Sequence, residues 1–291
     1  MLEKKISIIT PVYNQVDFIE QTILSVVDQG YSNLEYIIID GGSTDGTIDI
    51  IKKYESRITS WISEPDQGMY DAIDKGFSRS TGEIMAWINS DDLLLPNALH
   101  HMNHLMTELP QVEWVQGMNS AIDLQGNVID YRYGGKFSLI KFLQKDYQYV
   151  QQECTFWRKS LYERAGNRMN TKLKLAGDFE LWFRFSQNAK LYNCKLDIGT
   201  WRDRPGQLSR ANFDNYVKEA ERIIDAYVLN DEEKKRLNKI KTWRKIANAI
   251  KKASFYKLRL FNKRLHKLHG VDRADIIYSH NLQSYIIDPK S

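Results

Sequence analysis

Short apolar runs alternate with helical patterns through the first 92 residues of this chain. The runs lie at 6–9, 34–39, 58–62 and 83–88, and the helical spacing lies between them at 17–28, 47–54 and 68–77. Runs that are apolar at every position are typical of strands buried on both faces. Strands that alternate with helices build parallel sheets through crossover connections. We therefore predict an α/β fold around a covered central sheet.

Polar residues follow each of these predicted strands directly, at 10–14, 40–45, 63–68 and 89–92. Ligands of open α/β sheets bind outside the carboxyl ends of the strands, so these segments are the candidate site. Three of the four carry acidic residues, a pattern that suits a metal-bridged phosphate better than direct binding of an anion. Neither the dinucleotide motif GxGxxG nor the P-loop motif GxxxxGK[ST] occurs, which argues against those two classes.

The adjacent carboxylates Asp91 and Asp92 come directly after the fourth predicted strand. Neighbouring side chains at a strand end point to different sides, so one carboxylate can bind a hard cation while the other reaches a ribose hydroxyl. The alternative is a turn in which an Asp caps the helix that follows Pro96.

Four sequence blocks resemble the inverting glycosyltransferase family 2 in their order and spacing. The blocks are ITPVYN at 9–14, IDGGSTDGT at 39–47, SEPDQGMYDAIDKG at 63–76 and NSDD at 89–92. The resemblance implies a GT-A fold, with a Rossmann-like nucleotide-binding half and a mixed central sheet. It also implies a nucleotide-diphosphate-sugar donor.

Six residues are assigned to this donor and its metal by the resemblance: Pro11, Tyr13, Asp40, Asp66, Asp91 and Asp92. Tyr13 would stack on the nucleobase, Asp91 would contact the ribose, and Asp92 would bind Mn²⁺ or Mg²⁺ on the diphosphate. Gly41 departs from the family pattern, because many members carry there a second acidic residue that reads the base. UDP, GDP and dTDP therefore all stay open as the nucleotide of the donor.

The second half of the chain has a different pattern. Strands are predicted at 112–123 and 128–133, joined by a hairpin at 125–127, and helices at 159–164 and 179–186. A GT-A enzyme places its acceptor site in this half. We accordingly predict a nucleotide-sugar-binding half at 1–110, an acceptor-binding half at 111–211 and a basic helical extension at 212–291.

Asp178 stands where the last of these helices begins. One interpretation is a helix cap. The other, implied by resemblance to the family's acceptor-side block, is the general base that takes the proton of the acceptor hydroxyl. A single base opposite the leaving group gives inversion. Glu180 is the rival carboxylate, and with Gln152 and Trp201 it forms the predicted acceptor side.

The segment 200–210 resembles the mobile loop that closes over the donor in this family. Arg202, Arg204 and Arg210 are its cations. A guanidinium group matches the geometry of a phosphate, so we predict that Arg202 and Arg204 bind the diphosphate. The alternative is a solvated basic loop.

Basic residues are concentrated in one stretch near the C-terminus. The formal net charge is +4, yet residues 234–267 contain 14 Lys and Arg and no acidic residue, while the rest of the chain has a net charge of −10. Apolar residues recur there at helical spacing: Trp243, Ile246, Ala247, Ile250, Ala253, Phe261, Leu265 and Leu268. We predict a basic amphipathic helix that binds an anionic membrane, with packing on the protein itself as the alternative. No nucleic-acid-binding motif is present.

The sequence as a whole predicts an inverting, metal-dependent glycosyltransferase. Its acceptor would be a glycan carried on a lipid such as polyprenyl diphosphate, in surface-polysaccharide synthesis. No signal peptide and no apolar segment of about 20 residues is present, so we expect a cytoplasmic protein at the inner face of the membrane. A nucleotidyltransferase of related fold is the alternative enzyme, although no Gly-rich, Lys-containing loop follows the first strand. A non-catalytic membrane-binding module is the alternative outside enzymes.

Overall fold

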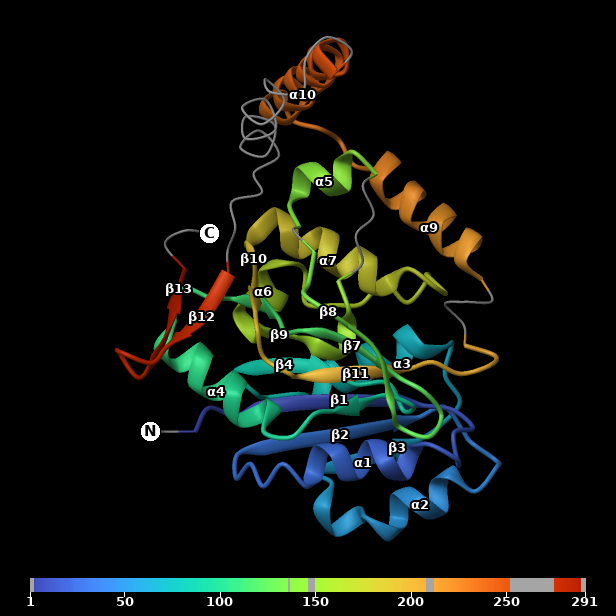
Figure 1. The fold of residues 1–291 in the computed structure, drawn as a ribbon. Helices are drawn as coiled ribbons and strands as arrows, with labels where there is room; N and C mark the ends of the chain where they lie inside the picture. The colour runs from blue at the N-terminus through green and yellow to red at the C-terminus, as the bar shows by residue number, and fades with distance from the viewer. Residues whose placement is uncertain (1–2, 136, 146–149, 208–211, 252–274, 289–291) are drawn as a thin grey trace.

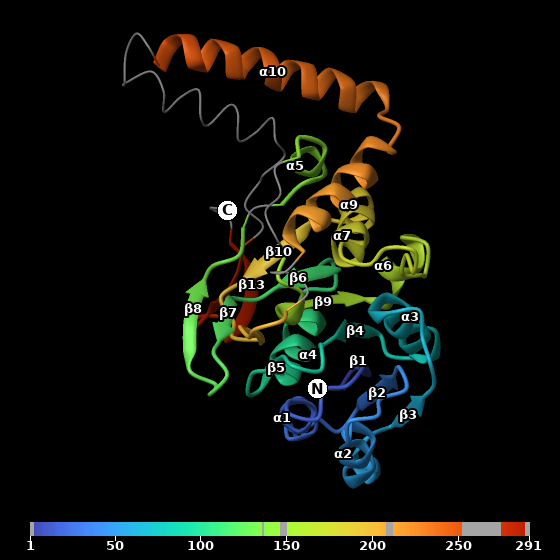
Figure 2. The ribbon, with the colours of Figure 1, turned by 90° about the vertical axis from the view of Figure 1, so that its right-hand side faces the viewer.

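Two β-sheets form the framework of the protein. The computed structural model describes residues 3–135, 137–145, 150–207, 212–251 and 275–288, without the side chains of 247–251. The main sheet has nine strands in the order β13-β12-β10-β6-β9-β4-β1-β2-β3, and the smaller sheet has the order β5-β11-β7-β8 (Figure 1). Figure 2 shows α1 and α3 on opposite sides of β1 and β2.

The first half follows the predicted alternation of strands and helices. Its strands are β1 (Ile6–Val12), β2 (Leu34–Asp40), β3 (Ser60–Ser63), β4 (Ile84–Trp87) and β5 (Leu93–Leu94). Its helices are α1 (Ile19–Val27), α2 (Thr47–Lys53), the short 3₁₀ helix η1 (Glu55–Arg57), α3 (Met69–Arg79) and α4 (Ala98–Glu108). All seven residues of β1 are buried, and β4, β1, β2 and β3 pair in parallel. The predicted α/β arrangement is confirmed.

The second half extends the same sheet and adds the smaller one. Its strands are β6 (Trp114–Gln116), β7 (Asn119–Ile122), β8 (Val128–Arg132), β9 (Thr155–Arg158), β10 (Leu191–Cys194) and β11 (Gly199–Arg202). Its helices are α5 (Leu139–Leu143), η2 (Gln152–Cys154), α6 (Lys159–Arg164) and α7 (Gly177–Asn188). Strand β9 runs antiparallel to both β4 and β6, so the main sheet is mixed, as predicted.

The single strand predicted at 112–123 is wrong, because two strands in different sheets occupy this segment. The chain passes from β6 to β7 through Gly117, where a Cβ atom would lie 2.7 Å from the carbonyl oxygen of Leu196. Only glycine permits this close approach of two backbones. The hairpin of β7 and β8 is confirmed by their antiparallel pairing.

The C-terminal extension combines helices with a hairpin. Helix α9 (Phe213–Asp225) is followed by α10 (Asp231–Lys251), which begins with three acidic residues, Asp231 to Glu233, and extends away from the sheets (Figure 2). The prediction of a helical extension is wrong at its end, where β12 (Asp275–Ser279) and β13 (Ser284–Ile287) join the main sheet beside β10. Ile276 and Tyr285 are buried there. Within the described ranges, no helix combines the length and hydropathy needed to cross a membrane.

Four tryptophans from different elements meet in the core between the halves. Trp87 of β4 and Trp114 of β6 stack on Trp182 of α7, with ring centroids 5.5 and 5.6 Å apart and interplanar angles of 12° and 23°. Trp157 of β9 meets Trp87 and Trp182 edge-on. Each of the four is at most 2 % exposed, so this cluster fixes α7 on the main sheet.

We expect Trp182→Ala to lower the free energy of unfolding by about 3–5 kcal/mol, since it leaves a cavity between two stacked rings. Urea denaturation followed by far-UV circular dichroism would measure the loss. Trp61→Ala, at a half-buried ring of the edge strand β3, is the matched control and should cost clearly less. Equal losses in the two variants would contradict the role assigned to the cluster.

Candidate active site

A pocket of about 580 Å³ lies at the carboxyl ends of β1 and β4. Its lining comes from the ends of these strands, from the loop before α3, from η2, from the beginning of α7 and from the segment after β11. Eight of the sequence-predicted site residues line it: Pro11, Tyr13, Asp66, Asp91, Asp92, Gln152, Asp178 and Arg204. Asp40, Glu180, Trp201 and Arg202 are not among the lining residues.

Asp40 holds the loop that follows β2 instead of facing the pocket. Its buried carboxylate accepts hydrogen bonds from the backbone N–H groups of Gly42 and Ser43, at 3.1 and 3.0 Å, and from the hydroxyl of Ser63 at 2.6 Å. All three bonds reach Oδ2, and the Ser43 hydroxyl donates to Oδ1, so both oxygens are engaged with protein groups. The structure therefore does not support the predicted contact between Asp40 and the nucleoside.

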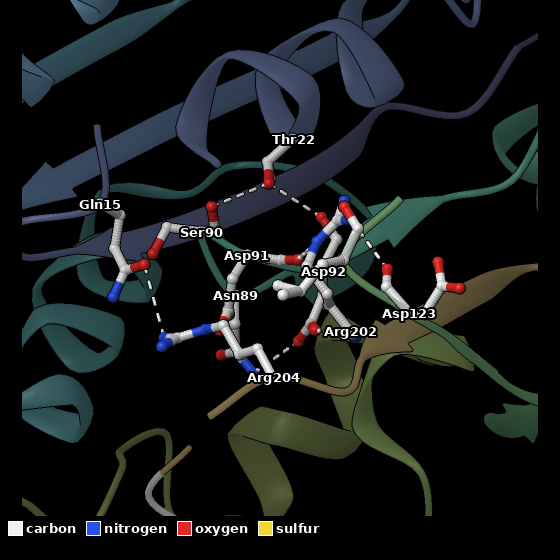
Figure 3. Close-up of polar contacts among 10 residues, drawn as sticks. Gln15, Thr22, Asn89, Ser90, Asp91, Asp92, Asp123, Arg202 and Arg204 are labelled. Carbon is white, nitrogen blue, oxygen red and sulfur yellow. Dashed lines mark hydrogen bonds and ion pairs between the residues drawn. The ribbon is translucent and has the colours of Figure 1, made fainter. Parts of the chain in front are cut away.

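Asp91 and Arg204 form an ion pair at the pocket wall. The Arg204 Nε atom lies 2.6 Å from Asp91 Oδ2, and its guanidinium group also donates to Gln15 Oε1 at 3.4 Å (Figure 3). The same group stacks over the ring of Phe18, 5.3 Å from its centroid. The other oxygen of Asp91, Oδ1, accepts no hydrogen bond from the described residues.

Arg202 is a buried structural residue and does not reach the pocket. Its guanidinium group donates to the carbonyl oxygens of Asp91, Asp123 and Leu124, at 2.9 to 3.3 Å (Figure 3). Only 1 % of the residue is exposed. Arg202 thus fastens β11 to the turn after β4, which argues against the predicted diphosphate contact. Arg210 lies outside the described residues.

Asp92 and Glu153 form a buried pair of carboxyl groups. Asp92 is 2 % exposed and accepts hydrogen bonds from the Arg202 backbone N–H at 2.9 Å and from Asn89 Nδ2 at 3.0 Å. Burial, and then the charge of Glu153, raises the pKa of Asp92 well above its usual value. Burial likewise raises the pKa of Glu153 to about 7. Two like charges in one buried site repel each other, so the pair favours a state in which one carboxyl group holds a proton.

Oxygen atoms near this pair suit a divalent cation. Among the described side chains, no group of three or more His, Cys, Asp or Glu residues is arranged to hold a metal by itself. Mg²⁺ and Mn²⁺, however, often take only one or two carboxylates from the protein and the rest from phosphate and water. Asn89 Oδ1 and Glu153 Oε2 are buried without a hydrogen-bond partner in the described structure. Together with Asp91 Oδ1, they form a donor set that fits such an ion.

Asp178 lies in the first turn of α7 and lines the pocket. Burial raises its pKa to about 6, although hydrogen bonds from the backbone and from the hydroxyls of Tyr216 and Tyr70 lower it. The Tyr70 hydroxyl lies 3.4 Å from Asp178 Oδ1 and donates to the carbonyl oxygen of Leu175 at 2.7 Å. A carboxylate with this pKa is deprotonated at neutral pH and is a stronger base than an exposed one.

The other predicted acceptor residues differ in whether they line the pocket. Glu180 pairs with Arg184 one turn along α7, at 2.9 Å, and Trp201 is a half-buried residue of β11 outside the pocket. Neither residue is among those that line the pocket, so the pocket gives these two predictions no support. Gln152 does line the pocket, and its side-chain amide donates to the carbonyl oxygen of Trp87.

Several lining residues were not predicted as site residues: Gln15, Tyr70, Lys174 and Tyr216. Glu153 is an acidic residue in the segment that also holds Gln152, and its burial is the signal that the sequence alone did not show. Lys174 donates to the carbonyl oxygen of Gln67 at 2.6 Å and is one of two cations in the lining, with Arg204.

The model of the family described as Glycosyl transferase family 2 matches residues 7–189. The chain belongs to this family. The match covers more than half of the sequence and includes the four blocks from which the family was predicted, so that prediction is confirmed.

Curated relatives are similar over part of their length. An uncharacterized glycosyltransferase of Rickettsia typhi is 28 % identical over 196 residues, which is 64 % of this chain and 60 % of the relative. The putative teichuronic acid biosynthesis glycosyltransferase TuaG of Bacillus subtilis is 40 % identical over 106 residues, or 35 % of this chain and 42 % of TuaG. The chain thus spans about 60 % of the Rickettsia relative and less of TuaG.

Two solved structures share the fold. S. aureus TarS 1–349 in complex with UDP-GlcNAc superposes with a TM-score of 0.63 at 17 % identity, over 80 % of this chain and 70 % of TarS 1–349. The mannosyltransferase PcManGT of Pyrobaculum calidifontis, in complex with GDP-Man and Mn²⁺, has a TM-score of 0.60 at 14 % identity, over 91 % of this chain and 81 % of PcManGT. The predicted GT-A fold is confirmed.

We expect Glu153→Gln to stabilise the metal-free protein at pH 8. A carboxyl group whose pKa is raised by folding supports the folded state below its unfolded pKa and loses that support as the pH rises through its folded pKa, here from about 4.5 to about 7. At pH 8 the variant should gain up to about 3 kcal/mol over the native chain, and at pH 4 the two should nearly agree.

Chemical denaturation in EDTA at both pH values would measure this difference. Glu64→Gln is the matched control, because Glu64 is exposed and pairs with Lys75 at the surface. A Glu153→Gln variant whose stability follows the native pH dependence would show that the buried pair does not share a proton.

Proposed function

We propose that this chain transfers a sugar from a nucleotide-diphosphate-sugar to a hydroxyl of a glycan acceptor, with inversion at the anomeric carbon, in the synthesis of a surface polysaccharide. The observation that carries the proposal is the pocket itself. Its lining combines Tyr13, Asp91 and Arg204 with a carboxylate, Asp178, whose pKa is raised to about 6. The similarity to TuaG, a putative teichuronic acid biosynthesis glycosyltransferase, supports a surface polysaccharide as the product.

The donor would lie along the ends of β1 and β4. The Tyr13 side chain is 59 % exposed at the pocket rim, so its ring is free to stack on a nucleobase. Arg204 would move from Asp91 to the diphosphate, because a guanidinium group binds phosphate and carboxylate with the same geometry. The complexes of TarS with UDP-GlcNAc and of PcManGT with GDP-Man support a nucleotide-sugar as the ligand.

A divalent cation, Mn²⁺ or Mg²⁺, would be held by Asp91, with the free oxygens of Asn89 and Glu153 close by. We place Asp91 ahead of the predicted Asp92, since both oxygens of Asp92 already accept hydrogen bonds within the protein. When bound, such a cation stabilises the charge that gathers on a leaving diphosphate. The Mn²⁺ in the PcManGT complex supports this assignment.

Asp178 would take the proton of the acceptor hydroxyl as that oxygen attacks the sugar. Tyr70 and Tyr216 orient its carboxylate, and the position of α7 on the main sheet keeps it in the lining of the pocket. A base on the side away from the leaving diphosphate produces inversion. The stacked cluster around Trp182 holds this wall in place.

We expect Asp178→Asn to lower the transfer rate at least 100-fold while leaving the affinity for nucleoside diphosphate nearly unchanged. Glu180→Gln, two residues away on the same helix and paired with Arg184, is the control and should stay active. In the native chain the rate should rise with pH through about 6, as Asp178 loses its proton. Radiolabelled sugar transfer and calorimetric titration would measure both effects. An active Asp178→Asn variant would reject the base.

We also propose that the protein works at the inner face of the cell membrane, on a lipid-linked acceptor. The described part of α10 presents exposed lysines at 234, 235, 239, 241 and 245, and Arg244 donates to Gln144 beside α5 at 2.9 Å. Ile246, from the predicted apolar stripe, is 39 % exposed, and residues 253–268 of that stripe lie outside the described residues. Exposed lysines in such density attract anionic lipid headgroups.

Neutralising four of these lysines (Lys234, Lys235, Lys239 and Lys241) to Gln should release the protein from vesicles rich in anionic lipid. The control replaces four exposed lysines elsewhere: Lys52, Lys172, Lys190 and Lys195. Vesicle sedimentation at low and high salt would measure the bound fraction, which should fall with salt. Equal partitioning of the native protein to neutral and anionic vesicles would exclude the membrane proposal.

A further inference from the structure

The Asp66 carboxylate occupies the space beside Gly41. A Cβ atom placed on Gly41 would lie 2.6 Å from Asp66 Oδ2 and 3.1 Å from its Cγ, which is too close for two such atoms. The backbone of Gly41 is not in the left-handed region that favours glycine. What excludes a side chain at position 41 is therefore the carboxylate of Asp66, which comes from the loop between β3 and α3.

Two sets of bonds hold Asp66 in this position. Its Oδ1 atom accepts the backbone N–H of Gly68 at 2.7 Å, and the neighbouring Gln67 carbonyl oxygen accepts from Lys174 at 2.6 Å. The loop beside it is fixed as well, because the Gly41 N–H donates to the carbonyl oxygen of Val12 at 2.9 Å. Asp66 Oδ2 accepts no hydrogen bond from a described residue.

This oxygen lies next to the end of β1, because the backbone of Gly41, which it adjoins, is hydrogen-bonded to Val12, the residue before Tyr13. Asp66 lines the pocket together with Pro11, Val12 and Tyr13 from the end of β1. Stacking on a ring such as Tyr13 tolerates every base, since each has a π face. Discrimination among bases therefore requires a polar group that meets the edge of the base.

We propose that Asp66 selects the nucleobase of the donor by accepting the ring N–H of uracil, thymine or guanine at Oδ2. This inference rests on the proposed function. An ionised carboxylate only accepts hydrogen bonds. Uracil and thymine present N3–H, and guanine presents N1–H. Cytosine and adenine present a ring nitrogen with a lone pair at the corresponding edge, which a carboxylate repels. Gly41 contributes by leaving the space that this carboxylate fills.

Calorimetric titration of the full chain with UDP, GDP, dTDP, CDP and ADP, in the presence of Mn²⁺, tests the proposal. We expect at least one of UDP, GDP and dTDP to bind about 10-fold or more tightly than CDP and ADP, as one hydrogen bond to a charged group provides. Asp66→Asn should abolish most of this preference. It should also raise the affinity for CDP relative to the other nucleotides, because the amide offers an N–H to cytosine. Glu64→Gln, an exposed neighbour paired with Lys75, should keep the native preference.

A second variant tests the geometry while keeping the carboxylate. Gly41→Ala should displace Asp66 Oδ2 and reduce the preference in the same direction, with a thermal midpoint close to that of the native chain. A native preference retained in both Asp66→Asn and Gly41→Ala would overturn the inference and leave the proposed function standing. If none of the five nucleotides binds, the proposed function fails as well.

Discussion

The stack of Trp182 between Trp87 and Trp114 is the contact on which the arrangement of the site depends. Trp87 ends β4, two residues before Asn89, and Trp182 lies one turn after Asp178 on α7. The segments that carry Asp91 and Asp178 are thus both attached to this one aromatic contact. Close-packed interiors transmit small displacements, so a shift of these rings would change the separation between Asp91 and Asp178.

The loops at the strand ends are held by side chains whose roles the sequence motifs alone do not reveal. Asp40 binds the backbone of its own loop, and Arg202 ties β11 to the turn after β4. Both look like ligand-binding residues in the sequence, since each stands at a strand end beside the site. In the folded chain, both side chains hold loops in place. The exposed Tyr13 and the ion-paired Arg204, in contrast, line the pocket.

Periodicity and motif order predicted the parts of this protein that depend on local pattern. Largely apolar runs identified β1, β2 and β4, because strands covered on both faces are mostly apolar along their whole length. The break at Gly117 was missed, since it depends on the close approach of Leu196, far away in the chain. The hairpin of β12 and β13 and the burial of Glu153 likewise depend on which distant elements pack together, and no local pattern shows that.

The carboxyl groups of the site have different pKa values because their surroundings differ. Glu153 is buried with one oxygen unpartnered and Asp92 beside it, and its pKa rises to about 7. Asp178 is also shielded from water, but hydrogen bonds from Phe179 N–H, Tyr216 and Tyr70 oppose the effect of burial, and its pKa is about 6. Near neutral pH, the proton therefore stays with the buried pair while Asp178 is ionised. Of these buried groups, Asp178 is the one that lines the pocket and is ionised near neutral pH, which is why we assign the proposed base to α7.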